Sequence, residues 1–330
     1  MLYNYNKYRN LLKGTAGFLP AIALIFLQAS APSAFSQDAV ANAALQQSQN
    51  LSQPSGTGPR ITPDGMVLPS AGSPEEAKCD EDLGEQWMLK HNQRPQFFNV
   101  FADVSGFYTS NVALAHKPEF ADSFIVASVG ASYSRPFGGV WAFNVGLSET
   151  LFRYDTYGDF NFDSFNAGGG LSLQAHQLWD TLFSLQYNYN RLTHGATSGE
   201  LFSGHNFTLS AVKSFQLSTA DSLSFGVTGS FNVADPASLM WGGGALFASY
   251  NVAVTRQLSV GANYRVTFFD YTDGPRRDVN QALSAGAHFN ANRWLSVNAS
   301  ISGIFNSSNK SAFDYRALNL GGGISGNIRF

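Results

Sequence analysis

Charged residues are scarce in this sequence, where they make up 13% of the 330 positions, about half the share of an average soluble domain. There is one cysteine, Cys79, so no disulfide can form within the chain. Beyond residue 36 the chain has no apolar run of the ~20 residues that a spanning helix needs. The net charge of −3 gives no indication of a nucleic-acid partner. The body of the chain is therefore not expected to cross a membrane with helices.

Residues 1–36 have the order of a secretory signal peptide. Lys7, Arg9 and Lys13 precede an apolar run of about a dozen residues, which small residues follow. The alternative is a membrane-anchoring helix, which Pro20 and the Ser and Pro residues after the run disfavour. Cleavage near Ser36 would leave 17 Lys and Arg against 23 Asp and Glu, a net charge of −6.

Residues 37–95 differ from the rest of the chain in composition. They are rich in Ala, Gln, Ser, Pro and Gly, which predicts a largely disordered periplasmic linker. A short helix is expected from Ser73, because Pro74 suits its first position and Glu75 and Glu76 its first turn. Cys79 lies in this part and is expected to be a free or partly buried thiol rather than a link to a partner.

From residue 96 to 330 apolar and small polar residues alternate. Around 258–269, for example, Leu258, Val260 and Tyr264 fall on one face of a strand, and Ser259 and Asn263 on the other. A membrane β-barrel hides its apolar residues in this way. The pattern predicts twelve strands, near 97–109, 123–135, 140–153, 164–177, 180–192, 204–216, 222–233, 242–255, 258–269, 280–292, 294–305 and 316–330.

The connections between the predicted strands alternate between long and short. The first, "SNVALAHKPEFAD", is long and the second, "PFGG", is short, and the order continues along the chain. This order is typical of an up-and-down antiparallel barrel with loops outside and tight turns in the periplasm. An even number of strands then places both chain ends on the periplasmic side. The predicted fold class is all-β, a transmembrane barrel at residues 96–330 in the outer membrane.

A secreted β-sandwich is the soluble alternative, since its strands also alternate. A sandwich would carry charged residues on its solvent face, whereas here that face is mostly Ser, Asn, Gly and Thr. A sandwich also has no reason to place aromatic residues at strand ends, where a membrane barrel has girdles. The expected inner girdle is Phe97, Phe137, Trp141, Trp179, Phe215, Trp294 and Phe330, and the outer one is Tyr108, Tyr154, Tyr157, Phe268 and Tyr271.

The last strand ends in "LGGGISGNIRF", with Ile324, Ile328 and the final Phe330 on one face. This ending resembles the terminal strand of Gram-negative outer-membrane β-barrel proteins, although the glycine frequent five residues before the end is Ser325 here. The resemblance implies that Ile324, Ile328 and Phe330 form an assembly signal, read by the barrel-assembly machinery and periplasmic chaperones. It also implies outer-membrane lipids and lipopolysaccharide as partners.

A second, shorter likeness lies in "FADVSGFYTSNVAL", at the first strand and its loop. It resembles the Gly-, Tyr- and Ser-Asn-containing stretch that opens barrels associated with exopolysaccharide secretion, with Gly106, Ser110 and Asn111 as the matching residues. The alternative is a Ser-Asn turn that leaves a strand through local side-chain bonds.

Twelve strands enclose a narrow space, well below the channel of sixteen-stranded porins. We expect a small passive or secretion pore, for which saccharides are a candidate solute, with residues 37–95 as a candidate plug. The ionisable residues expected to line it are Asp103, His176, Arg265, His288 and Arg329. These residues either set the selectivity of a pore or pair with one another and fill the interior. The first alternative function is a non-conducting structural barrel that anchors a periplasmic segment or displays loops. The loop with Arg276 and Arg277 would touch lipopolysaccharide sugars or a partner, unless it is simply a solvated turn.

A lipid- or peptide-cleaving enzyme is the second alternative. Its candidate groups are dispersed over several loops and no nucleophile motif surrounds a serine, so no catalysis, cofactor or metal is expected. Glu149 is unusual because strict alternation places it on the lipid face, and a β-bulge that turns it inward is expected. The dispersed groups are His116, His194, His205, Asp122, Asp163 and Glu200.

Overall fold

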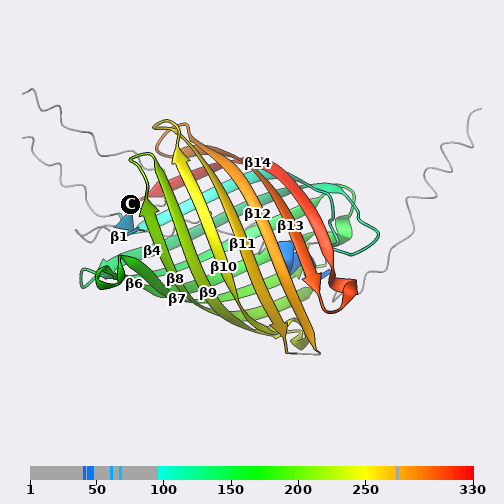
Figure 1. Ribbon diagram of the computed structural model, residues 1–330. Helices are drawn as coiled ribbons and strands as arrows, with labels where there is room; N and C mark the ends of the chain where they lie inside the picture. Colours follow the sequence, from blue (N-terminus) through cyan, green and yellow to red (C-terminus); the bar gives the residue numbers. More distant parts are fainter. Residues whose placement is uncertain are drawn as a thin grey trace, which may run out of the picture. The chain divides into compact units, whose positions relative to one another are not determined.

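Long antiparallel strands make up most of the described chain. The computed structural model describes residues 40–41, 43–47, 60–61, 67–68, 96–195, 197–272 and 275–330. Twelve strands close into a barrel (Figure 1). They are β3(Phe98–Thr109), β4(Asp122–Phe137), β5(Trp141–Tyr154), β6(Phe162–Ala175), β7(Thr181–His194), β8(Glu200–Gln216), β9(Asp221–Asp235), β10(Trp241–Ala253), β11(Leu258–Tyr271), β12(Arg276–Asn290), β13(Leu295–Ser308) and β14(Tyr315–Arg329).

The barrel closes where the last strand pairs with the first. β14 runs antiparallel to β3, with Ile328 opposite Val100 and Gly322 opposite Gly106. The pairing continues to the last residue, because the backbone N–H of Phe330 donates to the carbonyl of Phe98 at 3.0 Å. No strand edge of the barrel is left open, which satisfies the backbone groups of every strand inside a bilayer. The predicted fold class and the predicted strands are confirmed.

Alternation sets which side chains face outward. On β11, Val260, Tyr264 and Phe268 are exposed, whereas Asn263 and Arg265 between them are half-buried. The same parity holds on every strand, so large apolar side chains cover the outer face while the inner wall is built largely of small or polar residues. In a bilayer the exposed apolar side chains contact lipid tails, so the membrane removes them from water.

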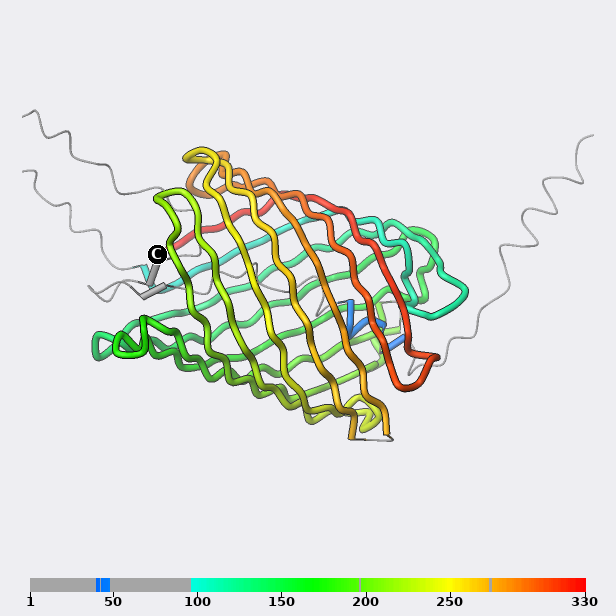
Figure 2. The backbone as a smooth tube through the Cα atoms, viewed as in Figure 1, coloured from blue at the N-terminus to red at the C-terminus, as the bar shows by residue number. Residues whose placement is uncertain are grey.

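The two ends of the barrel differ in their connections. Tight turns at 138–140, 176–180, 217–220, 254–257 and 291–294 lie at the end that also holds the C-terminus, named here the turn end. Figure 2 shows this end at the left, beside the C-terminal label. The other end, named the loop end, carries the connections 110–121, 155–161, 195–199, 236–240, 272–275 and 309–314. Every barrel strand except β3 extends one to four residues beyond the predicted bounds toward this end, so most loops are shorter than expected.

The connections of the loop end contain three short 3₁₀ helices, which are η1(Gly158–Phe160), η3(Ala237–Leu239) and η4(Ser311–Phe313). A fourth, η2(His176–Leu178), lies at the turn end. Before the barrel, β1(Arg60–Ile61) and β2(Val67–Leu68) pair with each other. Residues 40–41 and 43–47 are helical, which the linker prediction did not anticipate. The signal peptide at 1–36, the helix expected from Ser73, and Cys79 lie outside the described residues.

Among the residues that the structure describes, no helix is both long enough and apolar enough to cross a membrane.

Candidate functional site in the lumen

The inner wall of the barrel has two parts with different side chains. Inward positions near the turn end carry mostly neutral polar groups and are named here the turn half. Inward positions near the loop end combine aromatic and aliphatic groups with buried polar ones and are named the loop half. Asn99, Ser132, Asn144 and Gln186 represent the turn half and are partly accessible, whereas Phe162 and Leu192 of the loop half are 1% and 0% exposed.

Hydroxyl and amide side chains of the turn half pair between strands, either neighbouring ones or, across Gly170 of β6, β5 and β7. The amides of Asn144 and Gln186 exchange two hydrogen bonds, at 3.3 and 3.2 Å. The hydroxyls of Ser184 and Ser210 are 2.6 Å apart. Such pairs satisfy polar groups on the wall without charge. The turn half is therefore a largely neutral, hydrogen-bonding surface.

Four side chains on β10 and β11 depart from this pattern. Ser249, Asn251, Asn263 and Arg265 each have a buried polar atom without a hydrogen-bond partner among the described residues. Ser249 lies directly opposite Asn263, and the four face inward on adjacent strands. We call them the amide strip. Unpaired polar atoms on a wall are costly unless water or a bound molecule satisfies them.

Three of the five ionisable residues predicted to line the lumen lie inward on barrel strands, with Asp103 and Arg265 in mid-strand and His288 near the turn-end terminus of β12. Asp103 faces inward on β3 and accepts a hydrogen bond from Ser128. His288 lies on β12 with its Nε2 3.0 Å from Oδ1 of Asn290. Arg265 has its guanidinium carbon 5.9 Å from the centre of the Phe247 ring. No ion pair joins Asp103, His288 or Arg265 within the described part of the chain.

The other two predicted lining residues are at the turn end. Arg329 is exposed at the last position of β14, on the inward parity, so it belongs to the rim. His176 was expected on a strand, but β6 ends at Ala175 and His176 begins η2 in the turn. There Nδ1 of its exposed ring lies 2.6 Å from Oδ1 of Asp180, so His176 lies outside the wall.

The loop half is a packed core inside the barrel. The rings of Phe152 and Phe162 stack with centroids 4.1 Å apart, and Phe124 stacks on Tyr154 at 4.7 Å. Tyr154 and Tyr271 were predicted in the outer girdle, yet both are buried on the inner side. An aromatic residue near the end of a strand fits the sequence pattern of a girdle whichever face it lies on. Its odd or even position along the strand decides whether its ring faces lipid or lumen. Tyr108 and Phe268 do face outward, as expected.

The first connection of the loop end folds onto this core. Leu114 packs against Ile304, Tyr315 and Ala317 of the inner wall. The side chain of Asn111 holds the connection in place by donating to the carbonyls of Ala115 at 2.8 Å and Arg316 at 3.1 Å. Asn111, which the sequence placed in a Ser-Asn motif, therefore has a structural contact. These contacts bury the side chains of Leu114 and Asn111, which are 5% and 0% exposed.

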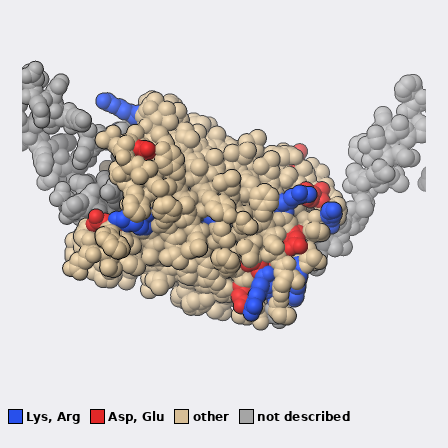
Figure 3. Space-filling view, viewed as in Figure 1, with Lys and Arg blue, Asp and Glu red and all other residues tan. Residues whose placement is uncertain are grey.

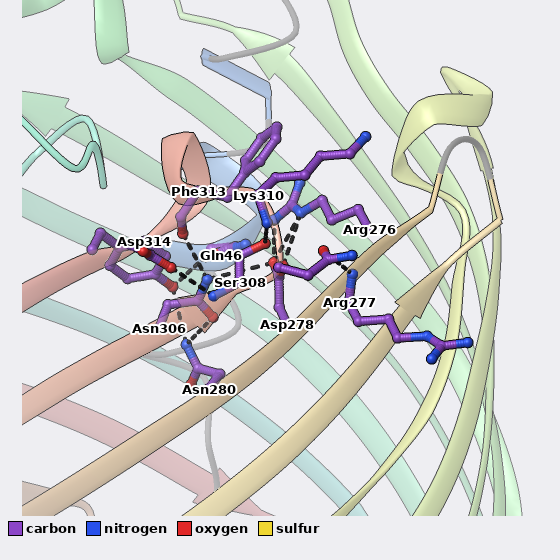
Figure 4. Close-up of polar contacts among 12 residues, drawn as sticks. Gln46, Arg276, Arg277, Asp278, Asn280, Asn306, Ser308, Lys310, Phe313 and Asp314 are labelled. Atoms are coloured by element: carbon purple, nitrogen blue, oxygen red, sulfur yellow. Dashed lines mark hydrogen bonds and ion pairs between the residues drawn. The ribbon is translucent and has the colours of Figure 1, made fainter.

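A buried ion pair lies at the loop end (Figure 4). Arg276 and Asp278 are adjacent on the inward face of β12, with Arg276 Nε 2.9 Å from Asp278 Oδ2. The guanidinium carbon lies 4.0 Å from the Tyr271 ring centre and 3.7 Å from that of Phe313. The prediction of an exposed lipopolysaccharide contact is thus wrong for Arg276, whereas the Arg277 side chain is 77% exposed.

Aromatic rings of the lumen lie flat where a neighbouring strand carries glycine. A Cβ at Gly226 would be 2.2 Å from the Phe247 ring, and one at Gly321 would be 2.1 Å from the Phe107 ring. A side chain at either glycine would therefore push the ring away from the wall. These glycines keep the rings on the wall, and the space along the axis stays wider.

Charged side chains are few on the visible outer face, where they gather toward the ends (Figure 3). Glu149 is an exception on β5. The register of β5 with both neighbours is regular, so the predicted bulge is absent at this position and Glu149 keeps the outward parity. Close by, Arg153 and Asp163 form an ion pair of 2.6 Å on the outward face.

The histidines considered for catalysis lie in different places. His116 is exposed in the 110–121 connection, and His194 ends β7 on the inward parity. His205 faces outward on β8, with its Nδ1 2.8 Å from the Tyr187 hydroxyl. His194 and His205 are thus on opposite faces of the wall. Among the described residues no group of three or more His, Cys, Asp or Glu is placed to hold a metal ion.

The residues of the predicted assembly signal share the outer face of β14. Ile324, Ile328 and Phe330 are 55%, 56% and 62% exposed. The Phe330 ring stacks on Phe98 of the first barrel strand, with centroids 6.0 Å apart. The signal is therefore accessible to a lipid or protein surface along its whole length, and its recognition by assembly proteins stays a prediction.

No family model and no curated protein matches this sequence. Solved structures do match the fold. The COG4313 outer membrane channel from Pseudomonas putida F1 has a TM-score of 0.53 at 8% identity, over 74% of this chain and 100% of that one. A bacterial polysaccharide outer membrane secretin has a TM-score of 0.43 at 10% identity, over 70% of this chain and 98% of that one. The translocator domain of autotransporter NalP from Neisseria meningitidis has a TM-score of 0.40 at 13% identity, over 72% and 90%.

The chain therefore has the fold of Gram-negative outer-membrane β-barrels. Together with the apolar outer face, this fold places the protein in the cell outer membrane.

Proposed function

We propose that the protein is a small outer-membrane pore that passes small polar solutes, with saccharides as the solute class. The observation that carries the proposal is the amide strip, where Ser249, Asn251, Asn263 and Arg265 present polar atoms without partners among the described residues. Hydroxyl, amide and guanidinium groups of this kind bind sugar hydroxyls, and the Phe247 ring beside Arg265 offers an apolar face for a sugar ring.

The neutral wall of the turn half supports the same solute class. A wall of hydroxyls and amides exchanges hydrogen bonds with an uncharged solute and exerts little force on ions. Asp103 and Arg265 carry opposite charges, so we expect weak ion selectivity that shifts when either is neutralised. The similarity to a protein described as an outer membrane channel agrees with this proposal at the level of the fold.

The test is single-channel conductance of the refolded mature protein in a planar bilayer, with and without residues 37–95. We expect discrete steps that a neutral oligosaccharide interrupts. Asn263→Ala should shorten the interruptions severalfold, since it removes an unpaired amide of the strip. Asn144→Ala is the matched control, because its amide is already paired with Gln186 and its loss should leave the interruptions unchanged.

Silence in both forms, from protein shown to be folded by its migration in an unheated gel, would overturn the pore. The packed loop half favours a second candidate in that event, a structural barrel that does not conduct and that displays its loop end. Leu192 at 0% exposure and Phe162 at 1% are the observations that support this alternative.

A further inference from the structure

In the segment 40–47, residues 40–41 and 43–47 are the positions before the barrel whose side chains the structure describes. The described positions are helical and buried, with Ala41 at 1%, Ala43 at 2% and Gln47 at 2% exposure. A helix of this length does not persist in water, and Ala and Gln provide little apolar surface of their own. A contact surface must therefore surround it, and the contacts of Gln46 identify that surface.

Gln46 bonds to two strands of the inner wall. The Tyr315 hydroxyl on β14 donates to its Oε1, and its side chain is also hydrogen-bonded to Tyr271 on β11. Both tyrosines are buried on the inward parity at the loop end. Figure 4 shows Gln46 beside the cluster of Asp278, Asn280 and Asn306, and Asn280 Nδ2 donates to the same Tyr315 hydroxyl at 3.0 Å. Gln46 thus joins strands that are not neighbours.

We propose that the inner wall of the loop half is a docking surface for residues 40–47 of the same chain, which act as a removable stopper. The docking is argued from contacts alone. The consequence that it closes a pore rests on the proposed function. The occupant is an Ala-rich helical segment, and the surface fits it because two tyrosine hydroxyls meet the Gln46 amide while Val40, Ala41, Ala44 and Leu45 are buried.

Two features make the stopper removable. The barrel closes through strand pairs that do not include residues 40–47, so the backbone hydrogen bonds of the wall do not depend on the segment. Gln47 is buried, and neither polar atom of its amide has a hydrogen-bond partner among the described residues. Docking therefore removes the Gln47 amide from water without replacing its hydrogen bonds. This cost reduces the favourable free energy that packing of the segment contributes.

The docking is tested by thiol labelling of the full mature chain in a Cys79→Ser background. Ala41→Cys should react with a small maleimide at least about tenfold more slowly than Gln177→Cys, because position 41 is 1% exposed and the turn is open to water. Tyr315→Phe removes the hydroxyl that donates to Gln46 and should speed the labelling of Ala41→Cys by about tenfold. Tyr108→Phe, on the outer face of β3, should leave it unchanged.

Hydrogen exchange of the unmodified chain removes the concern that a cysteine at position 41 disturbs the site. Amides of residues 43–47 should exchange at least about tenfold more slowly than those of the exposed turn at 217–220. Equal rates in both experiments would overturn the docking. Slow labelling together with silence of the form lacking residues 37–95 would instead keep the docking and overturn the pore, so the two proposals fail separately.

Discussion

The loop half and the turn half of the lumen are lined by the same twelve strands, yet their inward side chains differ in how far they are buried. In the loop half, rings stack as closely as 4.1 Å between Phe152 and Phe162, and the 110–121 connection adds Leu114 to the core. In the turn half, Asn144 and Gln186 bond to each other along a wall that stays partly accessible. One half resembles a soluble core and the other a vestibule.

This contrast teaches that alternation and filling are separate properties of a barrel. Period-two alternation decides whether a side chain faces lipid or lumen. The size of the inward side chains then decides whether the lumen is filled, and here that size changes along the barrel axis. Function is expected to follow the second property, because a solute that enters the turn half meets the loop half as a barrier.

The largest effect should come from the ion pair at the loop end. Arg276→Ala leaves the Asp278 carboxylate, whose side chain is 0% exposed, without its partner. Removing one member of a buried pair costs about 3–5 kcal/mol, because the remaining charge stays out of water. Urea unfolding in lipid vesicles, followed by tryptophan fluorescence, would measure this loss in the free energy of unfolding.

Arg277→Ala is the matched control on the next residue of β12. The Arg277 side chain is 77% exposed and its nitrogen is 3.5 Å from Asp270, so we expect a loss of less than about 1 kcal/mol. The double change Arg276→Met with Asp278→Leu should recover much of the loss, since it removes both charges together. Similar losses for Arg276→Ala and Arg277→Ala would show that water reaches the loop half.

An intermediate effect is expected where a glycine meets a ring. Gly226→Ala places a Cβ 2.2 Å from the Phe247 ring, which must leave the wall and enter the lumen. Overpacking of this kind costs about 1–3 kcal/mol and should also reduce the conductance of any open form. Gly229→Ala on the outer side of the same strand is the control, because no atom lies within 4 Å of its Cβ.

A double-mutant cycle decides whether the ring is the cause. With Phe247→Ala already present, Gly226→Ala should lose most of its cost, which would appear as a coupling energy between the two positions. If Gly226→Ala costs as much without the ring as with it, the strand backbone and not the lumen would explain the effect.

The strand pattern could be predicted from sequence because lipid and lumen impose opposite preferences on alternate residues. Val260 and Asn263 are therefore assigned correctly from parity alone. The direction of Tyr154, Tyr271 and Arg276 could have been assigned from the same parity, but their position near strand ends suggested a girdle or a loop. Parity is the stronger signal, because a strand that continues beyond the membrane still alternates.

Other features had no sequence signal to reveal them. Residues 40–47 have the Ala and Gln composition of a linker, and their burial depends on a surface formed by strands more than 200 positions later in the chain. The amide strip also has no signal in the sequence. Asn251 and Asn263 cannot be told from other inward asparagines until their hydrogen-bond partners are known. Glu149 is a case where the sequence signal misled. Its charge on the lipid-facing parity predicted a bulge, but the register of β5 is regular at this position.

The smallest expected effect compares one serine from each half. Ser164 in the loop half is 2% exposed and its hydroxyl accepts from Asn166 and Asn190, each at 3.1 Å. Ser164→Ala should cost about 1–3 kcal/mol in free energy of unfolding, since buried amide donors lose their acceptor. Ser184 in the turn half shares one hydrogen bond with Ser210, and Ser184→Ala should cost less than about 1 kcal/mol because water can replace the hydroxyl. The same urea titration measures both. Equal costs would mean that the two halves are equally wet, and the barrier at the loop half would then have to lie in the connections rather than in the wall.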